Sequence, residues 1–107
     1  MLFTPTSRQE KFQEMVNERG RRLRTVPFEE LRRLVNDQTE HLTVESREAT
    51  ITFIVQPQAD GAVRVVVQGF MSTWPFRGIK RVALDGFYKS PDETLAPMSR
   101  EEFREFD

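Results

Sequence analysis

Three side chains late in the sequence have the chemistry needed for proton transfer. Asp85, Tyr88 and Lys89 supply a carboxylate, a phenol and an amine within five consecutive residues. Such groups act as acids and bases when burial shifts their pKa values. On a regular strand Asp85 and Lys89 would share a face, but Gly86 suggests a bulge that breaks this alternation. We favour an exposed ion pair beside a half-buried tyrosine, and keep a ligand pocket at these residues as an alternative.

Other patterns that carry chemistry are missing from the chain. His41 is the only histidine and there is no cysteine, whereas a metal site needs several ligands at fixed spacing. The five glycines are scattered and form no phosphate-binding or dinucleotide-binding motif. The sequence therefore predicts no catalytic residue, no cofactor and no metal, and it favours a protein that is not an enzyme.

Basic residues are frequent between Arg19 and Arg33. They are Arg19, Arg21, Arg22, Arg24, Arg32 and Arg33. Nucleic-acid binding requires such charges in one patch that faces the phosphates, but glutamates lie between these arginines and would neutralise much of the field. A salt-bridged surface is the favoured interpretation. A nucleic-acid accessory protein is an alternative, and its candidate residues are Arg21, Arg22, Arg24, Lys80 and Arg81.

An aromatic segment spans residues 70–76 and contains two phenylalanines, a methionine and a tryptophan. Aromatic side chains are enriched in the residues that contribute most to protein–protein binding. The segment either anchors a partner or folds back over one end of the core, and the sequence leaves both open. The interface candidates are Val66, Phe70, Met71, Trp74 and Phe76.

Two helices are expected in the first third of the chain. Ser7 and Glu10 form a capping box, and apolar residues then recur with helical spacing. Arg19 falls on the same apolar face, so we expect the first helix to end near Arg19, with Gly20 in a left-handed conformation. A second helix is expected to start at Pro27 and to end at residues 36–37.

The middle of the chain alternates with the period of a β-strand. Ile51, Phe53 and Val55 share one face of a predicted strand, and Val63, Val65 and Val67 share one face of the next. The connection between these two strands is predicted to be a hairpin with a positive φ angle at Gly61. Residues 80–84 read as a further strand, residues 90–93 as a turn, and Ser99 with Glu102 as the start of a short helix.

These elements predict an α+β fold for one domain over residues 1–107. Two N-terminal helices within residues 7–36 pack on one face of an antiparallel sheet of about four strands within residues 41–89, and residues 90–107 form a turn and a short C-terminal helix. The other sheet face mixes polar side chains with apolar ones. These apolar residues are Ile54, Val66 and Phe70.

Composition narrows the class of protein further. Hydrophobic residues make up 37% and charged residues 31% of the 107-residue chain, which is typical of a soluble globular protein. No apolar run approaches the roughly 18–20 residues that span a bilayer, and residues 1–5 lack the pattern of a secretory signal. Together with the absence of cysteine, these features predict a cytoplasmic protein without a membrane partner.

The charges alternate in blocks along the chain. Residues 34–60 carry five acidic side chains and one basic one, whereas residues 61–90 carry one acidic and five basic. Residues 91–107 are acidic again, with six against two. Such blocks complement each other within one chain or between two copies. With the apolar second sheet face, they favour a protein-interaction module that forms a homodimer or binds another protein.

Overall fold

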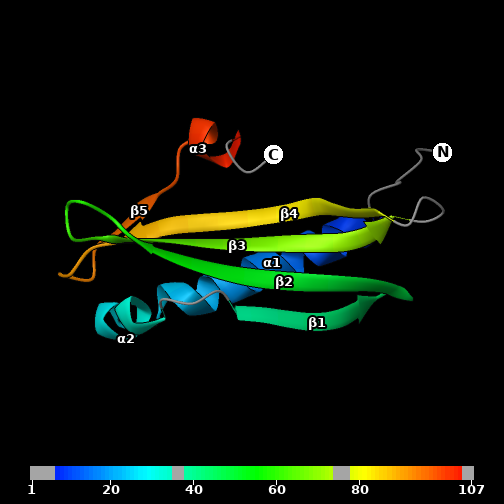
Figure 1. The fold of residues 1–107 in the computed structure, drawn as a ribbon, viewed down its shortest axis with the longest axis horizontal. Coiled ribbons are helices and arrows are strands. Elements are labelled where there is room, and N and C mark those ends of the chain that lie inside the picture. The colour runs from blue at the N-terminus through cyan, green and yellow to red at the C-terminus, as the bar shows by residue number, and fades with distance from the viewer. Residues whose placement is uncertain (1–6, 35–37, 74–77, 105–107) are drawn as a thin grey trace.

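The structure is a computed structural model that describes residues 7–34, 38–73 and 78–104, and the side chains within 8–34, 38–72 and 83–103. Figure 1 shows helices and strands along the chain. In order they are α1 (Ser7–Arg24), α2 (Phe28–Arg33), β1 (Gln38–Val44), β2 (Arg47–Pro57), β3 (Val63–Thr73), β4 (Gly78–Lys89), β5 (Leu95–Pro97) and α3 (Arg100–Arg104).

The strands form one antiparallel sheet in the order β1-β2-β3-β4-β5, and α1 lies behind it across one face (Figure 1). The α+β class predicted from the sequence is confirmed, but the described sheet has five strands where about four were expected. The extra strand, β5, pairs only three residues with Phe87–Lys89 of β4. A strand this short shows no alternation that sequence reading can detect.

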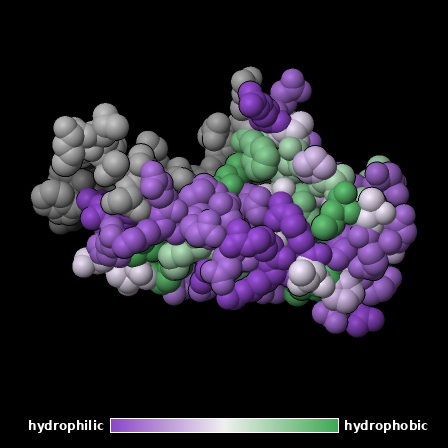
Figure 2. All heavy atoms as spheres, turned by 180° about the vertical axis from the view of Figure 1, so that it is seen from behind, coloured by the Kyte–Doolittle hydropathy of each residue, from purple (hydrophilic) through white to green (hydrophobic). Residues whose placement is uncertain are grey.

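The core lies between α1 and the sheet. Phe12 and Val16 of α1 are completely buried against Ile51 and Val67. Gly69 of β3 allows this close packing, because a Cβ atom at that position would lie 2.7 Å from the Phe12 ring. The outward side of α1 is covered mainly by hydrophilic residues (Figure 2), as the helical spacing of its apolar residues requires.

Gly20 lies inside α1 and does not end it. The helix continues to Arg24, so the expected end near Arg19 was wrong. Gly20 is buried, and a Cβ atom there would lie 1.8 Å from Oδ2 of Asp85 on β4. The glycine is needed for a close helix–strand crossing. Arg19 leaves the apolar face by turning its guanidinium to Glu40 on β1.

The second helix, α2, covers the far end of the same sheet face. Pro27 precedes it, and Phe28 and Leu31 are buried against Val55 and Phe87. This helix ends at Arg33, earlier than expected, and residues 35–37 lie outside the described part of the chain.

The turns that join β1 to β2 and β2 to β3 contain residues at positive φ, and the sequence predicts one of them. Gly61 has a φ of 91°, as predicted for the turn between β2 and β3. The turn between β1 and β2 contains Glu45 and Ser46, both at positive φ. Because neither residue is a glycine, the sequence did not predict this turn. The bulge expected at Gly86 was wrong, since pairing there is regular and the register shifts between Gly69 and Phe70.

Candidate functional site on the open sheet face

The sheet face opposite α1 is the candidate site, and we call it the open face. Cross-strand pairing places Thr50 opposite Phe70, and Ile54 opposite Val66. Side chains alternate along a strand, and the neighbouring Ile51 belongs to the core under α1. The paired residues therefore point to the other side of the sheet. The described open-face residues of β2 and β3 are Glu48, Thr50, Thr52, Ile54, Gln56, Arg64, Val66, Gln68, Phe70 and Ser72.

A hollow of about 470 Å³ lies on this face toward the β1–β2 hairpin. Phe70 is half-buried there and gives the hollow its aromatic surface. The remaining lining combines an imidazole, a carboxylate and hydroxyl groups with two aliphatic residues that also pack in the core under α1. These residues are His41, Leu42, Thr43, Glu48, Ala49, Thr50 and Ser72. The arrangement offers hydrogen-bond donors and acceptors around one apolar centre, which is typical of a binding surface.

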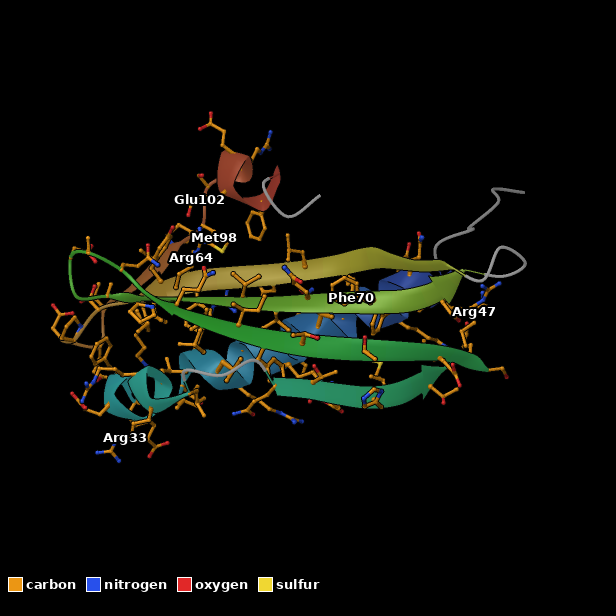
Figure 3. The ribbon with its side chains drawn as sticks, in the orientation of Figure 1. Arg33, Arg47, Arg64, Phe70, Met98 and Glu102 are labelled. Atoms are coloured by element: carbon orange, nitrogen blue, oxygen red, sulfur yellow. The ribbon has the colours of Figure 1, made fainter. Side chains whose placement is uncertain are left out.

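The other end of the open face is covered by the C-terminal part of the chain. Met98 is 6% exposed, and a Cβ atom on Gly86 would lie 2.2 Å from its Sδ atom. Glu102 of α3 accepts a hydrogen bond from the Tyr88 hydroxyl, and Arg64 Nη1 lies 3.6 Å from Glu102 Oε2. Figure 3 shows Arg64, Met98 and Glu102 gathered at one end of the sheet, with Phe70 further along β3.

The five interface candidates from the sequence do not lie together on one accessible surface. Phe70 lies in the hollow, whereas Val66 faces the same side but is completely buried within the chain. Met71 points to α1 and is 6% exposed. Trp74 and Phe76 lie outside the described residues. Among the described candidates, Phe70 alone supplies accessible apolar surface on the open face.

Asp85, Tyr88 and Lys89 do not meet in one pocket. Because pairing at Gly86 is regular, Asp85 and Lys89 point to the α1 side and Tyr88 to the open face. The Asp85 carboxylate accepts hydrogen bonds of 2.8 and 3.2 Å from Arg24. These residues connect the helices to the sheet, and Tyr88 connects the sheet to α3.

The described arginines of α1 are paired with carboxylates. Arg21 pairs with Glu14, and Arg22 with Glu18; Arg24 lies 4.7 Å from the centre of the Phe87 ring. In α2, Arg32 pairs with Glu29. Such pairing disperses the positive field that nucleic acid would need. The side chains of Lys80 and Arg81 lie outside the described residues.

Arg19 and Glu40 form an ion pair through two hydrogen bonds. Arg19 donates from Nε to Oε1 at 2.9 Å and from Nη2 to Oε2 at 2.7 Å. This hydrogen bonding lowers the pKa of Glu40 and raises the pKa of Arg19, against the opposing effect of desolvation. The pair fixes β1 to α1 and leaves no free charge for catalysis.

Within the described residues, no group of three or more metal-ligating side chains comes together, and no helix is long and apolar enough to cross a membrane. No protein-family model, curated protein or solved structure matches this chain.

Sequence reading missed the hollow and the packing of Met98 against Gly86. The capping box formed by Ser99 and Glu102 predicted α3. No local sequence pattern predicts which surface a short helix packs against.

Proposed function

We propose that this protein is a non-enzymatic interaction module that self-associates through the open face around Phe70 and acts in the cytoplasm. The observation that carries the proposal is the position of Phe70, an aromatic residue on a long strand beside a hollow. Phe70 is half-buried, so part of its ring remains in water, and a partner that covers this part gains hydrophobic free energy. The hydroxyl groups around Phe70 supply the polar rim that such interfaces carry.

A second copy of the chain is the partner that the charge distribution favours. Residues 34–60, which include β1 and β2, carry five acidic side chains and one basic one. Residues 61–90, which include β3 and β4, carry one acidic and five basic. On the open face, Glu48 lies near the start of β2, opposite Thr43, and Arg64 lies near the other end of that strand, opposite Gln56. A two-fold axis across the strands would bring the Glu48 end of one sheet against the Arg64 end of its copy. Complementary charges of this kind fix register and orientation.

The test compares two variants that each remove one apolar side chain. Phe70→Thr changes the proposed interface, whereas Phe53→Thr makes the same change at a half-buried phenylalanine of β2 that packs on the α1 side, away from the hollow. Threonine suits a strand in both cases. Light scattering with size exclusion over a concentration series should show a dimer that Phe70→Thr weakens by about tenfold or more. A wild-type monomer at all concentrations, or equal effects of the two variants, would contradict the proposal.

The hollow supports a small-molecule binder as a second candidate. Its volume of about 470 Å³ lies within the range of about 300–1,000 Å³ seen for ligand pockets. His41 and Glu48 would then contact the polar groups of the ligand. A thermal-shift screen tests this candidate, because a ligand at about a hundred times its Kd adds roughly 2.7 kcal/mol. A rise in Tm that Phe70→Thr abolishes, in a protein that stays monomeric, would favour it over the dimer.

A further inference from the structure

The C-terminal segment, residues 94–104, covers the end of the open face that the hollow does not reach. Its single buried residue among the described ones is Met98. Met98 Sδ sits where the side chain of Gly86 would otherwise extend, and Gly86 pairs directly with the buried Val66. The segment therefore occupies a notch in the same apolar face that carries Phe70.

One carboxylate anchors this segment by polar contacts. Glu102 Oε1 accepts a hydrogen bond of 3.0 Å from the backbone of Ser99, which closes the first turn of α3. Glu102 Oε2 accepts from the Tyr88 hydroxyl and lies 3.6 Å from Arg64 Nη1. Arg64 is itself held by hydrogen bonds of 2.9 and 2.5 Å to Gln56 Oε1. The cradle on the strands is thus preformed, and the segment contributes one acidic side chain to it.

The chain before the segment is fixed independently. Glu93 accepts hydrogen bonds of 3.0 and 3.2 Å from the Phe28 backbone N–H, and its carboxylate lies 3.3 Å from Lys89 Nζ. The segment can therefore leave the sheet at Thr94 without breaking these contacts. Residues 94–97 are all exposed, and β5 pairs with β4 through only three residues. Elements with few buried contacts open at low free energy.

The segment and the proposed partner have the same charge. Residues 91–107 hold six acidic side chains against two basic ones, and residues 34–60 hold five against one. Lys89 points to the α1 side, so Arg64 is the basic residue that the structure describes on the open face of β3 and β4. Glu102 of the segment already pairs with this cation.

We propose that the C-terminal segment is an intramolecular competitor of self-association: it covers Arg64 and the notch at Gly86 on the open face, and a second copy binds fully only when the segment is displaced. This inference rests on the proposed function and adds its regulation. Displacement uncovers Gly86 and Val66 and extends the apolar surface that starts at Phe70. A closed segment keeps the chain monomeric at low concentration, and a change that removes the Glu102 contacts promotes the dimer.

A charge reversal within α3 tests the competition. Glu102→Lys places a cation against Arg64, and the matched control Glu101→Lys makes the same change at an exposed neighbour. Release of the segment is measured as faster peroxide oxidation of Met98, followed by mass spectrometry. The dimer dissociation constant is measured by sedimentation, with circular dichroism confirming the fold. We expect Glu102→Lys to lower this constant by about tenfold relative to Glu101→Lys, and Phe70→Thr to abolish the gain.

A disulfide lock gives the same comparison without changing Glu102. The chain has no cysteine, and a Cβ atom at Gly86 would meet Met98 Sδ. We therefore choose Gly86→Cys with Met98→Cys as the crosslinked pair, with mass spectrometry to confirm that the disulfide forms. The oxidised protein should associate about tenfold more weakly than the same protein after reduction. Equal association of the two forms, or a Glu102→Lys variant that frees Met98 but dimerises like Glu101→Lys, would overturn the competition alone. No association in any variant would instead overturn the proposed function.

Discussion

Lys89, the last residue of β4, is bound to the C-terminal end of α1. Its Nζ atom donates hydrogen bonds to the carbonyl oxygens of Arg24 at 2.9 Å and Val26 at 2.7 Å. The last carbonyls of a helix have no partner within the helix, and a cation there also interacts favourably with the helix dipole. Lys89 therefore satisfies these carbonyls and fixes the path of the chain from α1 to α2.

Replacing Lys89 by methionine tests this role. Methionine keeps most of the apolar stem but removes both hydrogen bonds, in a residue that is 4% exposed. Hydrogen bonds to charged groups are each worth about 1.5–3 kcal/mol, and the buried apolar methionine offsets part of their loss. We therefore expect a loss of about 2–4 kcal/mol in the free energy of unfolding. Urea unfolding measures the change. The control is Lys11→Met, whose ion pair with Glu45 is exposed; a similar small loss in both variants would contradict the prediction.

Gly20→Ala should destabilise the protein although it lies within a helix. At an exposed helical position this change would gain about 1 kcal/mol. Here the new Cβ would lie 1.8 Å from Asp85 Oδ2, and Arg24 holds that carboxylate in place. We expect a net loss of about 1–3 kcal/mol in urea unfolding. In a background with Asp85→Ala the loss should shrink, and an undiminished loss there would show that this contact is not its cause.

The Arg19–Glu40 pair should make stability depend on pH. The hydrogen bonds from Arg19 lower the pKa of Glu40 in the folded state. A lowered carboxyl pKa stabilises the fold above the unfolded-state value of about 4.3, and this contribution disappears as pH falls through the folded-state pKa. Glu40→Gln should therefore cost up to about 1 kcal/mol at pH 7, with the difference closing below about pH 4.3.

Thermal unfolding across this pH range checks the prediction. The control is Glu101→Gln, an exposed carboxylate on α3, which should show little difference from the wild type at any pH. A constant difference between Glu40→Gln and the wild type from pH 7 to pH 3 would exclude the ion pair as its source.

The β1–β2 turn offers a stabilising change. Glu45 and Ser46 adopt φ angles of 46° and 70°, a conformation that costs residues other than glycine roughly 1 kcal/mol each. Ser46→Gly should raise the free energy of unfolding by about 0.5 kcal/mol, since part of the relief is lost to the freer unfolded chain. Ser46→Ala keeps the Cβ atom and should give no gain. Equal stability of the two variants in urea unfolding would contradict the explanation.

Sequence reading succeeded where local chemistry decides the structure. The alternation of Val63, Val65 and Val67 predicted β3, and Gly61 predicted its hairpin because only glycine adopts its φ freely. The Glu45–Ser46 turn was missed since neither residue type favours positive φ. Gly20 was misread because a glycine suits both a helix end and a close crossing, and only the position of β4 distinguishes them.

By itself the sequence determined the α+β class, the strand alternation that separates two sheet faces, and the short helix after Ser99. These follow from the period of apolar residues and from local hydrogen bonding. The tertiary structure alone decided that α1 passes Gly20, that Val66 is covered while Phe70 lies beside a hollow, and that Glu102 reaches Arg64. Each of these depends on contacts between residues far apart in the chain, whose pairing is set by the packing of whole elements.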